Sequence, residues 1–198
     1  MPPQSLFEDV FIISQRLWVM NEYSPAALLL AAASASLRLL GTDNPSLSNQ
    51  RSSALIQYSS TATAVKLKDP KALEYSEQAV KACQILYNKS HNNADLYLLM
   101  QAISIHDLAL FQRGHLEASL DCSRQVLLLL RTAPDVDDID SRIVTWTASG
   151  EADVVYSSDR EMSRPFDRAW DECLYLWNVA KSLAMLGQYA NARLRWTR

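Results

Sequence analysis

Residues 176–192 read LWNVAKSLAMLGQYANA, and this stretch decides the fold. Its apolar residues recur with the 3.6-residue period of a helix as far as Leu186. Gly187 then marks a turn, because glycine readily adopts the left-handed backbone conformation that ends many helices. Tyr189 and Ala192 follow as the opening of another apolar segment. The stretch therefore predicts a helix, a tight turn and the start of a second helix.

Helix-length segments separated by turn residues extend along most of the chain. Only four glycines occur in 198 residues, whereas all-β and doubly wound folds need many in tight turns and phosphate loops. Apolar residues make up 48% and charged residues 21%, as in ordinary soluble globular proteins. The sequence predicts an all-α fold. Helices are expected at residues 5–20, 25–40, 51–67, 70–88, 95–112, 116–132 and 167–186, with an eighth from Tyr189.

Small side chains recur at a common interval in the second helices of the first three predicted pairs. The interval is 46 residues (from 26 to 72) and then 47 (from 72 to 119), and it holds in three columns. Two antiparallel helices approach closely only where side chains are short, so such columns mark crossing points. The columns are Ala26, Ala72 and Ser119; Leu30, Ser76 and Ser123; and Ala33, Ala79 and Val126.

The Leu-Gly-x-Tyr-x-x-Ala turn at residues 186–192 resembles a tetratricopeptide repeat. Residues 109–120, around Gly114, form a looser copy, and Asn21, Tyr23 and Ala26 copy the turn again. The longer period is similar to the extended variant of the family found in kinesin light chains. The resemblance implies an α-α superhelix of about four helical hairpins, with three pairs in residues 1–132 and a last repeat in residues 166–198. That last repeat stops early in its second helix, so we expect a fragment, a truncated product or one half of an oligomer.

Residues 133–165 do not fit the repeat, and we interpret them as an insertion or a degenerate repeat. They carry an acidic run, residues 135–140, and an apolar patch, residues 143–146 with 154–156, compatible with a helix. A calcium loop that began at Asp135 would need glycine at its sixth position and glutamate at its twelfth. Asp140 and Trp146 stand there instead, so we expect a solvated loop without a metal.

Composition and motifs argue against several classes of function. The net charge of −3 gives no basic surface for nucleic acid or an anionic membrane. The three cysteines are far apart and are expected to be small buried helix residues. The three histidines are too scattered for a metal site. No phosphate-binding, nucleophile or metalloprotease motif occurs, so we expect no enzyme, no catalytic residue and no cofactor, and a cytoplasmic or nuclear protein.

In the family, the first helix of each pair lines a concave face that binds peptides. The resemblance places in that groove Phe11, Gln15, Trp18, Gln57, Thr61, Gln101, Ser104, Leu108, Phe111, Trp177 and Lys181. The positions of the carboxylate clamp that some members use for chaperone tails hold no cation here; they are Phe11, Gln15, Tyr58, Gln101 and Ile105. The resemblance therefore implies an apolar or amphipathic peptide. Alternatively, these side chains pack against adjacent helices or against the 133–165 segment folded into the groove.

Three functions remain open from the sequence. The first is a scaffold module that binds a peptide or helix of a partner protein in the groove. The second is self-assembly into a homo-oligomer through an uncapped C-terminal face around Val179, Leu183 and Trp196. The third is a helical domain that binds or transforms a small molecule.

Overall fold

The computed structural model describes residues 3–39, 46–132, 144–146, 152–154 and 168–188. Each of the seven predicted helices is present, with ends within about four residues of the expected positions, so the all-α prediction is confirmed. The helices are α1 (Pro3–Val19), α2 (Tyr23–Leu39), α3 (Leu47–Lys66), α4 (Ala72–Ser90), α5 (Asn93–Gln112), α6 (Leu116–Thr132) and α7 (Arg168–Met185). The predicted eighth helix lies outside the described residues.

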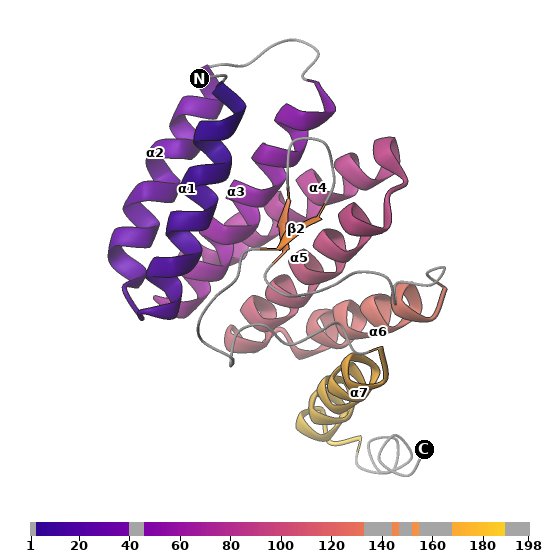
Figure 1. The fold of residues 1–198 in the computed structure, drawn as a ribbon. Helices are drawn as coiled ribbons and strands as arrows, with labels where there is room; N and C mark the ends of the chain where they lie inside the picture. Colours follow the sequence, from indigo (N-terminus) through magenta and orange to yellow (C-terminus); the bar gives the residue numbers. More distant parts are fainter. Residues whose placement is uncertain (1–2, 40–45, 133–143, 147–151, 155–167, 189–198) are drawn as a thin grey trace.

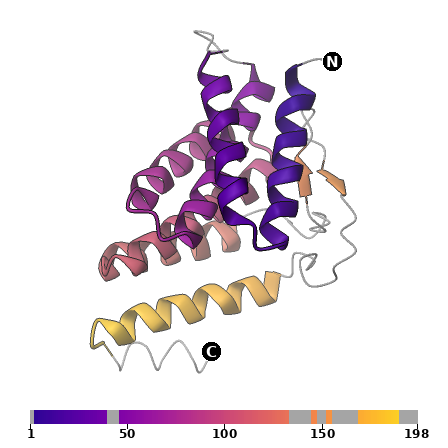
Figure 2. The same ribbon diagram turned by 90° about the vertical axis from the view of Figure 1, so that its left-hand side faces the viewer.

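The helices pack in the order in which the chain makes them. Each helix contacts the next one, and the first helices of successive pairs also meet, α1 with α3 and α3 with α5. Figure 1 shows the helices laid side by side from α1 and α2 to α7, and Figure 2 shows the same row from the side. A large core cluster contains Phe11 of α1 and residues from α3 to α7, and a smaller one lies between α1, α2 and α3.

The turns that end α1, α3, α5 and α7 share one backbone conformation. Residues 21, 68, 114 and 187 have positive φ values of 61°, 56°, 78° and 76°. In each turn the next residue donates its N–H to the carbonyl five residues earlier, as in a Schellman motif. These bonds are Glu22 to Leu17, Asp69 to Ala64, His115 to Leu110 and Gln188 to Leu183. The turn at Gly187 is therefore a recurring element of the described residues, even where asparagine or lysine replaces glycine.

The columns of small residues lie at the contacts between helices, as predicted. All nine residues of the three columns are buried. The serines have an added role, because Ser119 and Ser123 on α6 donate their hydroxyls to the Asp107 carboxylate on α5, the second at 2.5 Å. Burial nevertheless raises the pKa of Asp107, against the effect of these two hydrogen bonds.

His106 joins α5 to the column serine of α4. Ser76 donates its hydroxyl to the Leu73 carbonyl at 2.6 Å and lies 2.8 Å from His106 Nδ1. A neutral His106 with its proton on Nδ1 satisfies both contacts, because Nδ1 then donates to Ser76 while the Ser76 hydroxyl donates to Leu73. Burial lowers the pKa of His106 from its usual value of 6.5, although Glu77 and Asp107 act in the opposite direction.

We expect His106 to make the fold less stable in mild acid. The unfolded chain takes up a proton on His106 near pH 6.5, whereas the folded chain resists protonation until a lower pH. The contribution of neutral His106 is therefore fully present above pH 6.5 and is lost as pH falls through the folded-state pKa. Urea unfolding from about pH 8 to 5 should show the wild type losing stability relative to His106→Gln. Parallel pH curves for the two proteins would contradict this.

The described part of the 133–165 segment is a hairpin and not a helix. Strands β1 (Val144–Trp146) and β2 (Ala152–Val154) pair antiparallel, with Thr145 opposite Asp153. The expectation of a helix at residues 144–146 and at residue 154 is therefore wrong. Alternating Val, Thr and Trp are typical of strands, and one sequence cannot separate so short an apolar run from a helical turn. The acidic run lies outside the described residues.

Helix α5 is the central helix of the core. By length and composition it is the one described helix that could cross a membrane, with a mean hydropathy of 1.2 over its most apolar stretch. Most of that stretch is buried inside the protein. Its apolar character therefore fits packing between α3, α4 and α6.

Candidate functional site

Two residues of the predicted groove are core residues. Phe11 is only 7% exposed and belongs to the main core cluster with Leu55 and Leu99. Thr61 is also buried and donates its hydroxyl to the Gln57 carbonyl at 2.9 Å. Neither side chain is therefore available in a groove, because the resemblance assigned these positions to a face of the helix without knowledge of how each helix is rotated about its own axis.

Other predicted groove residues bind the neighbouring first helix. Gln15 on α1 donates to the Ser59 hydroxyl on α3 at 3.4 Å, and Trp18 Nε1 donates to the Thr63 hydroxyl at 3.1 Å. The partners are 44 and 45 residues apart, which is close to one repeat. The alternative in which these side chains pack against adjacent helices is therefore confirmed for Gln15 and Trp18.

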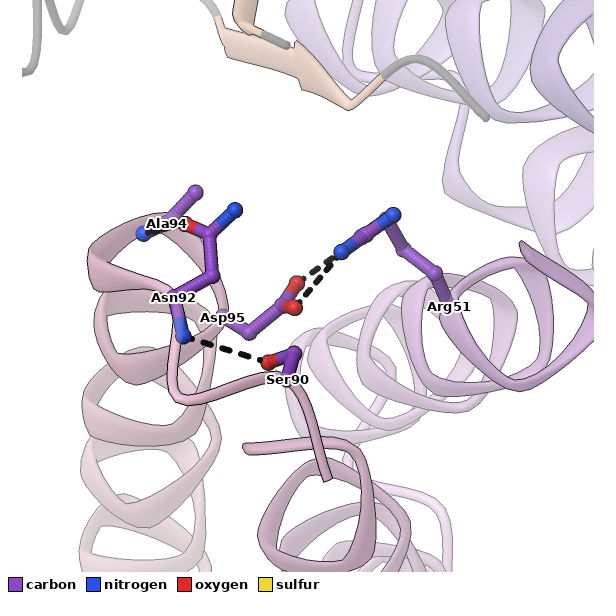
Figure 3. Close-up of polar contacts among 5 residues, drawn as sticks. All are labelled: Arg51, Ser90, Asn92, Ala94 and Asp95. Atoms are coloured by element: carbon purple, nitrogen blue, oxygen red, sulfur yellow. Dashed lines mark hydrogen bonds and ion pairs between the residues drawn. The ribbon is translucent and has the colours of Figure 1, made fainter. Parts of the chain in front are cut away.

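A buried ion pair continues the same connection from α3 to α5. The Arg51 guanidinium donates through Nε and Nη2 to both carboxylate oxygens of Asp95, at 2.9 and 2.7 Å. Figure 3 shows the two side chains facing each other between the helices, next to the turn where Asn92 caps α5. Arg51 and Asp95 are also 44 residues apart. Polar contacts one repeat apart thus fix the register of the first helices.

Trp18 is held on three sides at the end of α1. Its ring meets that of Tyr23 edge-on, with centroids 5.2 Å apart, and the Lys66 ammonium lies 5.3 Å from its centroid. Together with the hydrogen bond to Thr63, these contacts engage the Trp18 indole with residues of the protein itself. Trp18 therefore stabilises the α1–α2–α3 junction and is a poor candidate for a partner's anchor site.

Four predicted residues come together on α5 and α7 and form what we call the α5–α7 patch: Leu108, Phe111, Trp177 and Lys181. The Lys181 ammonium lies 3.9 Å from the Phe111 ring centroid and 5.3 Å from that of Trp177. Leu108 is 42% exposed and Trp177 is 45% exposed. The patch therefore presents apolar and aromatic surface around one cation.

The remaining predicted residues lie outside the patch. Ser104 and Tyr175 join α5 to α7 through a hydroxyl contact of 2.6 Å. Gln101 is half-buried on α5. Gln57 lies on the other side of α3, where its amide donates to the Ser53 hydroxyl at 3.0 Å. The face formed by the first helices of the pairs, α1, α3, α5 and α7, is called the first-helix face. Most of its predicted groove residues make contacts between helices, and its accessible part lies at α5 and α7.

The β1–β2 hairpin covers the other end of the first-helix face. Strand β1 contacts α1. Figures 1 and 2 both place the hairpin beside α1, on the side of the stack where α1, α3 and α5 lie. The described part of the 133–165 segment thus lies against α1, the first helix of the stack.

Sequence reasoning missed a groove on the opposite side of the molecule. Helices α2 and α4 form its walls and α3 its floor, and it has a volume of about 1190 Å³. Its charged lining residues are Asp69 and Lys89, which lie at opposite ends of α4. A signal was present in the sequence, because residues 23–37 of α2 contain no charged side chain, which is unusual for a helix at the surface.

The titratable groups do not form a reactive centre within the described residues. Burial raises the pKa of the Cys83 thiol to about 12 and that of Cys122 to about 11, so neither thiol is activated. Cys83 is buried, but Cys122 is only partly buried and Cys173 is exposed, contrary to the expectation that all three cysteines are buried. The described ranges contain no group of three His, Cys, Asp or Glu residues that could hold a metal ion.

No protein family model, curated protein or solved structure matches the chain.

Proposed function

We propose that the chain is a tetratricopeptide-like α-α superhelix that works by binding a partner protein and not by catalysis. Three observations support this architecture: the repeated Schellman turns, the buried small-residue columns, and the polar contacts one repeat apart between first helices. Solenoids of this kind use one continuous face for recognition. The partner-binding region in this proposal is the α5–α7 patch.

The exposure of Trp177 beside Lys181 is the observation that carries the proposal. Tryptophan is among the residues most enriched at binding hot spots, because it buries a large area with little loss of conformational freedom. Here the ring is held next to the Lys181 ammonium and near Phe111, while about half of its surface faces solvent. The ring is therefore oriented before a partner arrives, which lowers the entropic cost of binding.

The chemistry of the patch defines the partner segment. Leu108 and Trp177 offer an apolar contact surface, and the Lys181 ammonium can donate to a carbonyl or carboxylate of the ligand. A short amphipathic helix or extended peptide fits, with an aliphatic or aromatic anchor next to an acceptor group. A multi-carboxylate tail does not fit, because Lys181 is the one cation in the patch.

A peptide selected on the full-length chain tests the proposal. Peptides enriched from a random display library would be titrated by calorimetry onto the wild type and onto Trp177→Ala, Leu108→Ala and Leu128→Ala. We expect Trp177→Ala to weaken binding at least about 30-fold, which corresponds to about 2 kcal/mol. Leu128→Ala removes a leucine on α6 that is 62% exposed, more than the 42% of Leu108, and should change the affinity less than about 3-fold. Equal affinity for all four proteins would refute the proposal.

A further inference from the structure

The outer face of α2 is apolar and exposed. Leu28 is 74% exposed and projects from a stripe that includes Ser24, Ala31 and Ala35, all of which line the groove between α2 and α4. A helix at the surface of a soluble protein normally carries charged side chains on its outer face. Residues 23–37 carry none. This face therefore has the composition of a contact surface.

The groove beside α2 is hollow and partly lined by exposed apolar side chains, so it is complementary to the projecting apolar face of α2. Two further exposed apolar side chains, Leu67 and Ile85, line it together with Leu28. The Ser60 hydroxyl on its floor is shielded from solvent and has no hydrogen-bond partner. Exposed aliphatic side chains around a hollow favour an occupant that is itself aliphatic and carries hydroxyl or amide groups.

We infer that the occupant is a second copy of this chain, whose α2 lies in the groove while its own groove receives α2 of the first. A projecting Leu28 and the hollow lie side by side on one face, so two copies related by a two-fold axis insert each leucine into the other's groove. Such an isologous interface needs the same patch to be complementary to itself.

The charges at the ends of the groove agree with this two-fold arrangement. Asp69 lies just before α4, and Lys89 lies in its last turn. A two-fold axis perpendicular to the groove reverses its direction, so the Asp69 end of one copy faces the Lys89 end of the other. The lining residues between these two carry no charge, so the facing grooves of identical copies do not repel each other across the axis. Lys68 and Lys71 flank Asp69 but do not line the groove.

The extent of the surface fits a stable dimer. The groove is lined by 21 residues from α2, α3, α4 and the α3–α4 turn, and a standard interface uses roughly 20–30 residues on each partner. The C-terminal face that the sequence suggested for self-assembly does not serve, because Val179 and Leu183 are buried in the main core cluster. Trp196 lies outside the described residues.

Sedimentation velocity of the full-length chain tests this inference. We expect a monomer–dimer equilibrium that shifts towards dimer as the concentration rises from roughly 1 to 200 µM, a range that brackets micromolar dissociation constants. Leu28→Glu should raise the dimer dissociation constant by about 100-fold or more, because it places an unpaired carboxylate at both symmetric contacts. Ala31→Arg, on the same exposed stripe, should act in the same way. Both positions are exposed in the single copy, so the variants should keep the wild-type circular dichroism spectrum.

Two controls separate this face from general surface stickiness. Leu128→Glu places the same charge at a leucine that is 62% exposed on α6, and Leu28→Met preserves volume and apolarity. Both should keep the dissociation constant within about 3-fold of the wild type. A wild type that sediments as a monomer over the whole range would overturn the inference and leave the groove to another occupant. Equal weakening by Leu28→Glu and Leu128→Glu would overturn it as well. Peptide binding at the α5–α7 patch is measured separately, so either idea can fail alone.

Discussion

Arg51→Met is expected to lower the free energy of unfolding by about 3–5 kcal/mol. The Arg51 side chain forms a bidentate ion pair with Asp95, and both side chains are fully inside the protein. Removing the guanidinium leaves the Asp95 carboxylate without its charged partner in a region that water does not reach. The cost comes mainly from that unpaired charge, since a buried pair itself adds little net stability.

A double-variant cycle separates the pair from the packing around it. Asp95→Leu alone should cost a similar amount, because it leaves Arg51 buried without its carboxylate. The double variant Arg51→Met, Asp95→Leu should recover most of the loss, with a coupling energy on the order of 2–3 kcal/mol. Urea unfolding at neutral pH measures all four proteins. Additive losses would show that the two side chains act independently, contrary to the geometry.

Ser123→Leu is expected to destabilise the fold by about 3 kcal/mol or more, from two causes. Ser123 is completely buried at the α5–α6 contact, so a larger side chain forces the helices apart. The hydroxyl also donates to the Asp107 carboxylate at 2.5 Å, and the variant leaves that oxygen without this donor. Overpacking contributes about 1–3 kcal/mol and the lost hydrogen bond about 1.5–3 kcal/mol.

Ser123→Ala distinguishes the two causes. It removes the hydroxyl without adding volume, so its cost is that of the hydrogen bond alone. Gln125→Leu, two residues along on the exposed side of α6, adds apolar volume where nothing must move and should change stability by less than about 0.5 kcal/mol. Thermal or urea unfolding gives the three differences. A Ser123→Leu protein as stable as the wild type would mean that the column does not set the helix spacing.

The choice of side chain in the columns illustrates how local sequence and packing agree. Ala26, Ala72 and Ser119 occupy the same contact in successive pairs, and each is buried. Serine appears where a neighbouring helix supplies a polar partner, as Asp107 does for Ser119 and His106 does for Ser76. Serine thus fits the small space between the helices and also forms a hydrogen bond with the buried polar group on the neighbouring helix.

The sequence alone determined the helices, their turns and the close-packed columns, because these depend on short-range spacing. Helix period, glycine at positions such as Gly114 and the recurrence of small residues are all local patterns, and the structure confirms them. The same reasoning places Leu108 and Phe111 one turn apart on one face of α5, whereas the contact of Phe111 with Lys181 on α7 depends on the packing of the helices.

Only the tertiary structure decided which side of each helix faces a neighbour. Phe11 and Thr61 turned inward, Trp18 bonded to Thr63, and Arg51 met Asp95 across a full repeat. Helix rotation and the approach of α2 to α4 result from the packing of all the helices together, and no single segment encodes them. The groove beside Leu28 exists for that reason, because its walls come from helices that are about 50 residues apart in the chain.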